Sequence, residues 1–332
     1  MKKFGTRLIS AVLAGCMMTS VLPVSAFALE GSTEFERTVS AQENSDASAE
    51  PSGEGYPLPT DSATTINKDF IADHGKVYSM SGTYTEGIVI DAEDEDVVIN
   101  VTGETTFDKG GNRDDCANFI TVRNAKSVTV NAEGQTIKTA EGRNYSRCFY
   151  AENTFTGTAV LHGGTYNEQC GRVAACYLCG GNWTFDNLTM YAVERAIETD
   201  KGANVTVEGG TYNCHDSTSS TFLIQNSTNS SFNGVTASGA GWVLNAVNSW
   251  VNVVGGSYSS NEGAQVYKDR PTLRVANNAT LNVTNADVTG TYCDVFVTNA
   301  TANLFGGTYT NTNQYPGYMS PALKVWNGGT LS

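Results

Sequence analysis

Alternating apolar and polar residues along most of the chain indicate short β-strands. Residues 205–207 read Val-Thr-Val and residues 251–253 read Val-Asn-Val, the alternation of strands that bury one face. After Ala28 no window carries the period of about 3.6 residues that a long amphipathic helix needs. We therefore predict an all-β body in which these valines point inward while Thr206 and Asn252 face water.

A repeated unit divides the chain into coils. An alternating run followed by Gly-Gly-Thr-Tyr or Gly-Gly-Ser-Tyr ends at Tyr166, Tyr212, Tyr258 and Tyr309, and the Thr or Ser of these units are 46, 46 and 51 residues apart. One degenerate copy in each gap reduces the repeat to a coil of about 22 residues with insertions. Three short strands fit this length, each pairing with its copy in the next coil, and Gly-Gly supplies a corner with positive φ. The period predicts a parallel β-helix of about ten coils, and its right-handedness is what the resemblance described below implies.

A second recurring mark is an asparagine that precedes the Thr or Ser of a unit by nine to twelve residues. These residues are Asn124, Asn153, Asn226, Asn248, Asn277 and Asn299. Asparagine tolerates the left-handed region, so we expect it in turns, and stacked copies predict a ladder of side-chain amides. The 46-residue spacing also fits the blades of a β-propeller, although the degenerate copies halve it and no propeller signature occurs.

The N-terminus has the pattern of an export signal. A basic start is followed by an apolar stretch over residues 8–21 and by Ala-Phe-Ala at residues 26–28, which predicts a signal peptide over residues 1–28. A second interpretation takes residues 13–16, Leu-Ala-Gly-Cys, as a lipobox with Cys16 lipidated, but the apolar stretch continues past this cysteine. Both interpretations predict a secreted or cell-surface protein.

The remaining chain separates into a linker and a repeat domain. Residues 29–66 are rich in Ser and Glu with few aliphatic side chains, which predicts a disordered acidic linker, because such a segment buries too little surface to offset its ordering entropy. The β-helix domain is expected over residues 67–332. Its C-terminal sequence SPALKVWNGGTLS stops within a coil, so we expect a truncated domain whose end is covered by further coils or by a partner.

The acidic balance narrows the classes of partner. The formal charge is −14, and the Lys and Arg residues occur singly among carboxylates. Nucleic acid is excluded as a partner, because phosphate binding needs clustered basic residues. The expected partners are a polysaccharide, a glycan, or a host or cell surface.

Seven of the eight cysteines lie beyond the leader, an odd number that leaves at least one unpaired within the chain. Cys176 and Cys179 form a C-x-x-C motif, but the second pair of ligands that a zinc ribbon needs is missing. We interpret the cysteines as small buried or outward thiols on neighbouring coils, with one disulfide compatible with this pattern.

The Gly-Gly-Thr-Tyr units, the coil length and the Asn turns resemble those of the right-handed parallel β-helix superfamily that includes pectate lyases. They are more similar to the non-enzymatic β-helix repeats of large bacterial surface and adhesin-like proteins. The resemblance covers residues 67–332, and residues 67–107 resemble the opening coils of such domains. It implies the fold but no activity, because the repeated residues are structural.

One group of carboxylates stands out on a single coil, namely Glu194, Glu198 and Asp200. We expect Glu198 to project outward near Glu152 on an earlier coil and Gln225 on a later one. A pair of carboxyl groups about 5 to 10 Å apart serves as acid and base in glycoside hydrolysis, so Glu198 and Glu152 are catalytic candidates. The alternative is an ordinary solvated surface, since every solenoid carries outward polar residues.

Arg270 and Arg274 approach the Arg-x-Pro-x-x-Arg pattern of pectate lyases, with one spacer residue missing. They are candidates for a catalytic base, but the missing residue would move the first Arg to the other face of a strand, which favours solvated loop residues. The histidines His74, His162 and His215 lie on separate coils without a Ser or Cys partner, so no catalytic triad is predicted.

An acidic turn offers oxygen ligands for Ca²⁺, the one metal that the sequence suggests. Its carboxylates are Asp91, Glu93, Asp94, Glu95 and Asp96. The spacing of an EF-hand is absent, and a solvated acidic turn explains the same residues. A second acidic loop contains Asp108, Asp114 and Asp115.

Two functions remain open from the sequence. The first is a structural or adhesive surface module, whose long Thr-, Asn- and Ser-rich faces bind glycans or surfaces through many contacts. The second is a polysaccharide lyase or glycoside hydrolase acting on an acidic or mucin-type polysaccharide, for which the fold offers a groove along one sheet. An enzyme should gather charged residues from several coils into one cleft, whereas an adhesive module should disperse them.

Overall fold

The computed structural model describes residues 55–216, 218–260, 270–312 and 321–332. The chain divides into two units, Met1–Ala49 and Glu50–Ser332, and all described residues belong to the second. The predicted signal peptide, Cys16 and most of the predicted linker therefore lie outside the described residues.

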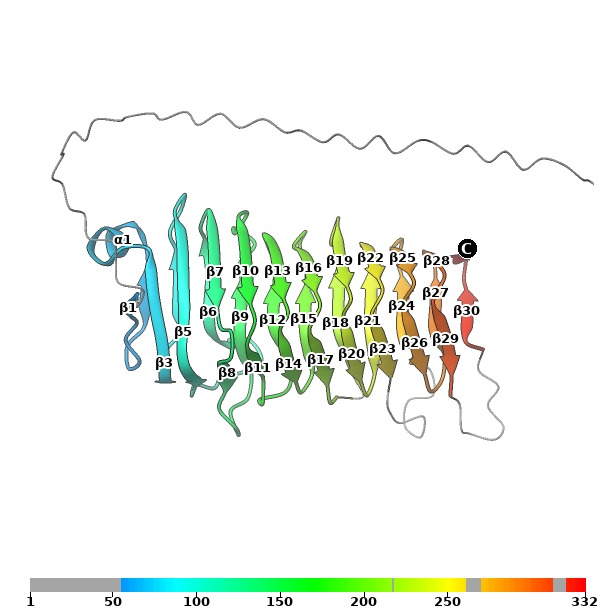
Figure 1. Ribbon diagram of the computed structural model, residues 1–332, viewed down its shortest axis with the longest axis horizontal. Helices are drawn as coiled ribbons and strands as arrows, with labels where there is room; N and C mark the ends of the chain where they lie inside the picture. The colour runs from blue at the N-terminus through cyan, green and yellow to red at the C-terminus, as the bar shows by residue number, and fades with distance from the viewer. Residues whose placement is uncertain (1–54, 217, 261–269, 313–320) are drawn as a thin grey trace, which may run out of the picture. The chain divides into compact units, whose positions relative to one another are not determined.

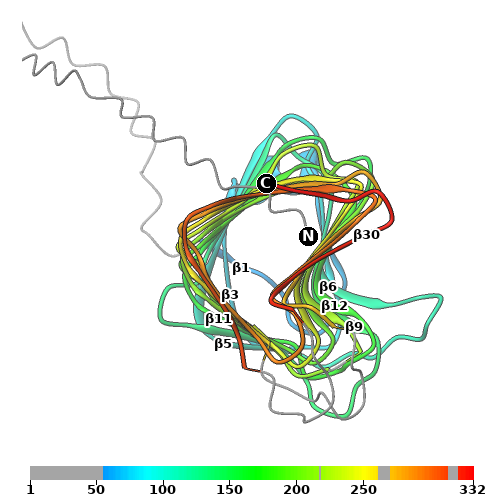
Figure 2. The same cartoon turned by 90° about the vertical axis from the view of Figure 1, so that its right-hand side faces the viewer.

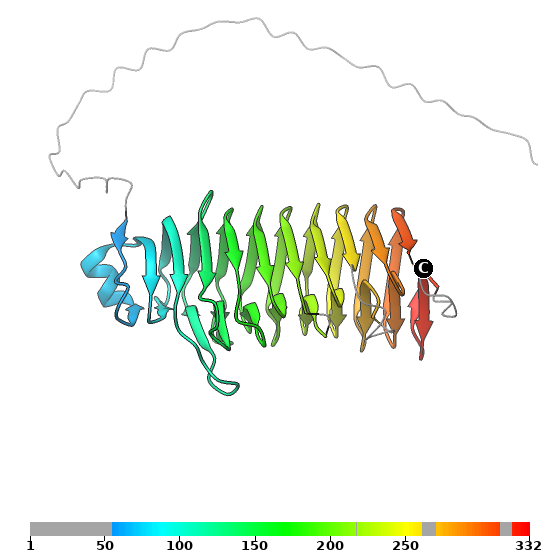
Figure 3. The same cartoon turned by 90° about the horizontal axis from the view of Figure 1, so that it is seen from below.

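The second unit is a right-handed parallel β-helix, as the repeat predicts (Figure 1, Figure 3). Its strands form an 11-stranded and a 20-stranded sheet, and the pairings between described strands are parallel throughout. The larger sheet bends at a corner between β10 (Thr158–His162) and β11 (Thr165–Asn167), which pair with different neighbours. Each coil therefore has three faces, and successive coils superimpose when the unit is viewed along its axis (Figure 2).

The strands are distributed over these three faces. Face 1 is the 11-stranded sheet and comprises β2 (Thr64–Ile66), β4 (Ile88–Asp91), β6 (Ala117–Asn124), β9 (Ser146–Ala151), β12 (Ala174–Leu178), β15 (Arg195–Thr199), β18 (Ser220–Gln225), β21 (Trp242–Val247), β24 (Leu273–Ala276), β27 (Val295–Thr298) and β30 (Leu323–Trp326). Face 2 comprises β1 (Tyr56–Pro57), β3 (Val77–Tyr84), β5 (Asp96–Phe107), β7 (Ser127–Asn131), β10, β13 (Asn182–Asp186), β16 (Asn204–Glu208), β19 (Ser230–Asn233), β22 (Trp250–Val254), β25 (Thr280–Thr284), β28 (Thr301–Phe305) and β31 (Thr330–Leu331). Face 3 continues from the ends of β3 and β5 into β8 (Thr136–Thr139), β11, β14 (Thr189–Ala192), β17 (Thr211–Cys214), β20 (Thr236–Gly239), β23 (Ser257–Ser260), β26 (Asp287–Gly290) and β29 (Thr308–Asn311).

A short helix, α1 (Lys68–His74), lies at the N-terminal end of the stack (Figure 1). The side chain of Asn67 caps it by accepting a hydrogen bond from the backbone N–H of Phe70 at 2.9 Å. Ile71 is buried, and Phe70 packs against the core of the first coil. The ordered strands begin before the expected boundary at Asn67, because β1 pairs with β3 and β2 pairs with β4.

The interior is a continuous column of aliphatic and aromatic side chains. The valines at positions 205, 207, 251 and 253 are at most 1% exposed, as the alternation predicts. The tyrosines that follow the Gly-Gly pairs at 166, 212 and 258 are fully buried and contribute to this core rather than to a surface site. Burial of side chains on every coil is the main stabilising contribution in such a solenoid.

The corner between faces 2 and 3 explains the Gly-Gly pair. Gly209 and Gly210 have φ of 63° and 83°. A Cβ on Gly210 would lie 2.3 Å from the carbonyl oxygen of Leu188 in the preceding coil, so only glycine fits there. A Cβ on Gly209 would lie 2.5 Å from Oδ1 of Asn187 in the same preceding coil.

At two corners the first glycine makes room for an asparagine of the preceding coil. The preceding coil places an asparagine side chain over the corner, and the next coil leaves room for it by having glycine there. The same relation holds between Asn285 and Gly306, where the separation would again be 2.5 Å. Gly255 differs, because the preceding coil has Gly234 at this corner and a Cβ on Gly255 would meet nothing within 4 Å.

The asparagine turns are confirmed for four of the six predicted positions. Asn226, Asn248, Asn277 and Asn299 have positive φ. Asn124 does not, because it is still a strand residue paired with Asp91, and neither does Asn153. The predicted amide ladder forms where Asn248 donates to Asn226 at 2.8 Å and Asn226 donates to Asp200 at 2.7 Å.

The seven cysteines of the described residues are all free thiols, and only Cys116 is partly exposed. Burial raises the pKa values of the buried thiols, including those of Cys148 and Cys176, which keeps them protonated and unreactive. The C-x-x-C motif places Cys176 in the interior and Cys179 almost completely buried. Within the described residues, no group of three or more His, Cys, Asp or Glu side chains is arranged to hold a metal ion.

We expect a single reactive thiol in the native protein lacking residues 1–28. Cys116 should react rapidly with Ellman's reagent, whereas the other six thiols should react only after denaturation, because they are buried and protonated. Replacement of Cys116 by serine should remove the fast phase. Rapid modification of several thiols in the folded protein would contradict the burial described above.

The last described coil differs from the others in exposure. Leu323 and Val325 continue the interior column above Val295 and Val297, but they are 39% and 45% exposed.

Among the described residues, no helix has the length and apolar character needed to cross a membrane.

Candidate functional site

The outer surface of face 1 carries a column of aromatic and charged side chains in register. The column consists of Tyr150, Tyr177, Glu198, Leu223, Asn245, Arg274, Phe296 and Lys324. The corresponding outward column of face 2 consists of Thr129, Val160, Thr184, Thr206, Ser231, Asn252, Asn282 and Asn303. We call the eight residues on face 1 the face 1 column. Their side chains are chemically more varied than those of the outward column of face 2.

The two tyrosines at the N-terminal end of the face 1 column pack with an arginine that lies beside the column. The rings of Tyr150 and Tyr177 are stacked, with centroids 5.9 Å apart and planes 19° apart. The guanidinium of Arg147 lies over both rings, 4.9 Å from the centroid of Tyr177. Arg147 also donates to Oδ1 of Asn118 at 3.3 Å. This packing fixes a flat, partly exposed aromatic surface beside a positive charge.

Glu198 follows in the same column and is held by two neighbours. Nη1 of Arg195 contacts Glu198 at 3.1 Å, and the amide of Gln225 donates to Glu198 at 3.3 Å, so the expected proximity to Gln225 is found. The same nitrogen of Arg195 contacts Glu194 at 2.8 Å. Burial raises the pKa of Glu198, and the adjacent guanidinium of Arg195 opposes this shift.

Glu152 lies elsewhere on face 1 and has no contact with Glu198. Its carboxylate accepts hydrogen bonds from Nε of Arg123 at 3.1 and 3.2 Å, and Nη1 of Arg123 reaches Asp91 at 3.3 Å. In register with Glu198 are Tyr177 and then Tyr150, two residues before Glu152. The structure therefore does not bring the two predicted carboxylates together as an acid and base pair.

The carboxylates of the acidic turn form ion pairs. Arg123 contacts Asp91, Lys68 contacts Glu93, Lys76 contacts Glu95, and Lys126 contacts Asp96. The hydrogen bond from Ser127 and the contact with Lys126 lower the pKa of Asp96. Asp94 lies on the same turn, and Asp108 of the second acidic loop pairs with Arg143 at 2.7 Å. These bases occupy oxygens that a Ca²⁺ ion would need.

Arg270 and Arg274 are brought together over one aromatic ring. Their guanidinium carbons lie 4.9 and 5.4 Å from the ring centroid of Trp242. Arg274 also donates to Oδ1 of Asn245 at 2.9 Å. Both arginines therefore contact the same tryptophan. The residues in register with Arg274 on the neighbouring coils are Asn245 and Phe296, so neither neighbour is an acid.

A depression beside the starts of the face 1 strands gathers residues from five segments of the chain. The residues that matter here are Arg113, Arg147, Arg172, Tyr145, Glu194 and Asp216. We call it the arginine depression. The sequence did not predict it, because Arg113 and Arg172 lie in loops of different length and Arg147 lies in β9, so no spacing in the sequence marks them as neighbours.

The loop of Arg172 is organised by a buried carboxylate. Glu168 is 1% exposed and accepts hydrogen bonds from the backbone N–H groups of Cys170 at 2.5 Å, Gly171 at 2.8 Å and Val193 at 3.0 Å. Burial raises the pKa of Glu168, and these three donors oppose the shift. Glu168 thus joins its own loop to the next coil at Val193.

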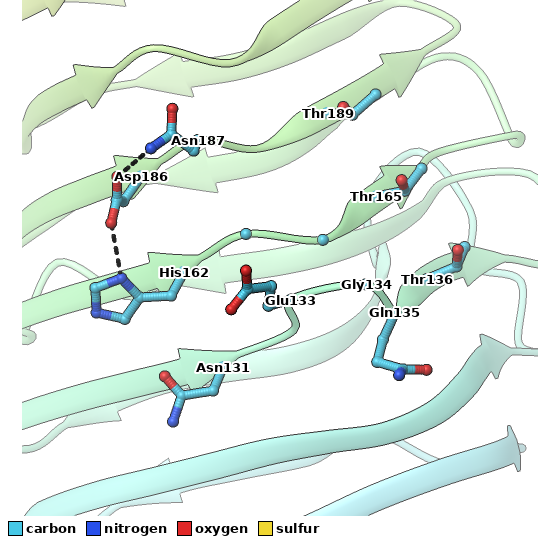
Figure 4. A pocket seen from close by; sticks show the side chains of 12 residues that line it. Asn131, Glu133, Gly134, Gln135, Thr136, His162, Thr165, Asp186, Asn187 and Thr189 are labelled. Carbon is cyan, nitrogen blue, oxygen red and sulfur yellow. Dashed lines mark hydrogen bonds and ion pairs between the residues drawn. The ribbon is translucent and has the colours of Figure 1, made fainter.

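A polar recess lies at the corner between faces 2 and 3, above the bare backbone of Gly163 and Gly164 (Figure 4). Nδ1 of His162 lies 3.0 Å from Oδ2 of Asp186, and Asn187 donates to the other oxygen of that carboxylate at 3.1 Å. The recess exists because the Gly-Gly pair has no side chains to fill it. The recess is also lined by the hydroxyls of Thr136, Thr165 and Thr189, and the hydrogen bond of its histidine goes to Asp186 rather than to one of them.

Comparisons with protein-family models, with curated proteins and with solved structures found no match to this chain. The description of the fold and of the face 1 column therefore depends on the chain's own residues and geometry.

Proposed function

We propose that this is an exported, secreted or cell-surface β-helix protein that binds glycans along the outer surface of face 1. The observation that supports it best is the face 1 column, in which stacked tyrosines and hydrogen-bonding groups from successive coils share one surface. The likeness of the repeats to those of adhesin-like bacterial surface proteins supports the same function.

The chemistry of this column suits carbohydrate. An aromatic ring offers a flat apolar face against which a sugar ring can pack. Tyr150 and Tyr177 supply two such rings on neighbouring coils. Side chains such as Gln225 and Asn245 supply amide groups that hydrogen-bond to hydroxyls. Neighbouring coils are about 4.8 Å apart, so an extended polymer can contact several coils and gain affinity from many weak contacts.

Replacement of Tyr177 by alanine is expected to weaken glycan binding about tenfold or more, because a stacked ring contributes about 1 kcal/mol or more beyond its buried area. Tyr191 is the matched control, since it is a 40% exposed tyrosine on face 3. Its replacement by alanine should leave the affinity unchanged. Affinity electrophoresis in gels containing pectins or mucin glycans measures the effect.

Two results would contradict this proposal. One is a wild-type protein that is retained by none of the pectins or mucin glycans. The other is an equal loss of affinity in the Tyr177 and Tyr191 variants, which would indicate that the ligand does not distinguish face 1 from face 3.

A glycoside hydrolase is the second candidate, and one observation favours it. Glu194 and Glu198 contact the same nitrogen of Arg195, which holds the two carboxylates close together. Retaining hydrolases use two carboxyl groups about 5 to 5.5 Å apart, and a raised pKa such as that of Glu198 suits a general acid. The guanidinium of Arg195 forms an ion pair with both carboxylates, however, which is typical of a structural ion pair and favours the binding function.

Incubation with pectins and mucin glycans, with and without Ca²⁺, separates the two functions. A binding module should release no reducing or unsaturated ends. If ends do appear and replacement of Glu198 by glutamine abolishes them while glycan retention persists, the hydrolase is the correct function.

A further inference from the structure

We propose that the arginine depression binds an anionic group of an acidic glycan, a carboxylate or a sulfate, without the help of a metal ion. This inference rests on the proposed glycan-binding function and adds to it the chemical class of the ligand.

The three arginines of the depression have no carboxylate within ion-pair distance among the described residues, although Arg147 is near enough to Glu198 to lower its pKa. Arg147 donates to Asn118 and lies over Tyr177, Arg172 donates to the hydroxyl of Tyr145 at 3.3 Å, and Arg113 lies on an exposed loop. Within the described residues, none of these three guanidinium groups forms an ion pair, although the whole chain carries a charge of −14. A chain rich in carboxylates that leaves three neighbouring arginines unpaired has positive charge available for a ligand.

The carboxylates that border the depression are already engaged. Glu194 is paired with Arg195 at 2.8 Å. Asp216 accepts hydrogen bonds from the backbone N–H of Thr218 at 2.6 Å and from its hydroxyl at 2.8 Å. Arg195 is shared by Glu194 and Glu198. Four guanidinium groups, those of Arg113, Arg147, Arg172 and Arg195, therefore stand against the three carboxylates of Glu194, Glu198 and Asp216. The local charge is therefore positive.

The backbone around two of these residues is strained. Tyr145 and Arg172 both have positive φ, 54° and 69°, which is uncommon for residues with a side chain. The two residues contact each other, because the guanidinium of Arg172 lies 5.7 Å from the ring centroid of Tyr145. Strain of this kind costs about 1 to 3 kcal/mol per residue and is concentrated where a side chain must be held for binding.

Glu168 supplies the structure that holds Arg172. Its carboxylate fixes the backbone N–H groups of Cys170 and Gly171, directly before Arg172, and that of Val193, directly before Glu194. One buried group therefore sets two rims of the depression relative to each other. A fixed rim reduces the entropy lost when a ligand binds.

Guanidinium groups match the geometry of a planar or tetrahedral oxyanion, since each offers parallel N–H donors. A sugar that packs on Tyr177 would place a charged substituent near Arg147, which lies over the same ring. Neutral glycans would gain only the stacking contact. The depression therefore predicts a preference for acidic over neutral glycans.

The first experiment compares arginine variants of the full mature chain. Replacing Arg113, Arg147 or Arg172 by glutamine should each weaken binding of an acidic glycan at least fivefold. Replacing Arg123 by glutamine, which removes an arginine already paired with Asp91 and Glu152 on the same face, should not. Circular dichroism and thermal unfolding check the fold, and Arg113 is the informative variant if Arg147 proves necessary for packing, because it is exposed.

The second experiment changes the glycan rather than the protein. Low-ester pectin is compared with fully methyl-esterified pectin, and mucin is compared with its sialidase-treated and desulfated forms. A loss of binding of tenfold or more on esterification or sialidase treatment supports a carboxylate, and the same loss on desulfation supports a sulfate. Affinity for the acidic form should fall when salt is raised from low to high concentration, because the arginines are exposed to screening.

The outcomes separate the two levels of the proposal. If glycans are bound equally well with and without their charges, and the arginine variants bind normally, the arginine depression is not an anion site, whereas glycan binding by face 1 still stands. If chelation by EDTA abolishes binding, a cation holds the anion and the metal-free inference is wrong. If no glycan is retained at all, the proposed function itself fails.

Discussion

Replacement of Gly210 by alanine is expected to destabilise the β-helix by about 3 kcal/mol or more, compared with about 1 kcal/mol for the same change at Gly202. Both glycines have positive φ, 83° and 94°, so both substitutions strain the backbone. They differ in what a methyl group would meet. At Gly210 it would lie 2.3 Å from the carbonyl oxygen of Leu188, whereas at Gly202 no atom lies within 4 Å.

The added loss at Gly210 arises because relief of the clash must separate two coils. The hydrogen bond from the N–H of Thr211 to the carbonyl oxygen of Leu188, 2.8 Å long, lies at the point of closest approach. Urea unfolding followed by circular dichroism measures the difference between the variants. Equal destabilisation of both would show that backbone strain alone, and not contact between coils, requires glycine at this corner.

Replacement of Asp294 by asparagine is expected to stabilise the C-terminal coils at pH 8 by roughly 3 kcal/mol and to have little effect near pH 4. Asp294 is fully buried, and within the described residues neither of its carboxyl oxygens has a hydrogen-bond partner. It takes the interior position that Thr272 holds one coil earlier. Burial raises the pKa of Asp294 from 3.8 to about 7, and the nearby backbone N–H of Gly290 opposes this shift.

The direction follows from proton linkage. Because the folded protein binds this proton more tightly than the unfolded chain, the stabilising contribution of protonated Asp294 is complete below about pH 4. It is lost progressively as the pH rises through about 7, where the buried carboxyl must ionise. Asparagine does not ionise, so its advantage should grow over the same pH range.

Hydrogen exchange of the amides of β27 measures this effect locally, which is appropriate because solenoids open from part of their length. The comparison must be the difference between variant and wild type, because surface carboxylates with lowered pKa values, such as Asp96 and Asp108, change stability in the opposite direction with pH. A difference that does not depend on pH between 4 and 8 would contradict a buried, unpartnered carboxyl at this position.

The sequence by itself determined the coil. Alternation fixes which side chains of a strand share a face, so the inward positions of Val205 and Val253 could be predicted from their neighbours alone. A glycine doublet specifies a backbone conformation that other residues adopt only with strain, so the corner could be located as well. These features are local and repeated, and each copy strengthens the same prediction.

The tertiary structure decided which outward residues meet. Coils differ in length because insertions lie between strands, so the distance in sequence does not give the register between coils. The sequence correctly predicted that Glu198 lies near Gln225. It was wrong for Glu152, because the residue in register with Glu198 on that coil is Tyr150, two positions earlier. The three arginines of the depression come from separate segments, and only the parallel pairing of face 1 brings them to one surface.

Burial of polar groups was equally inaccessible from the sequence. In the sequence Glu168 and Asp294 look like ordinary loop residues. In the structure Glu168 accepts hydrogen bonds from three backbone N–H groups, and Asp294 is buried with no hydrogen-bond partner for its carboxyl oxygens among the described residues. Local pattern specifies the conformation of a segment, whereas the environment of a side chain depends on what the neighbouring coils place around it. For this protein the local pattern therefore specified the fold, whereas the packing of neighbouring coils decided the candidate site.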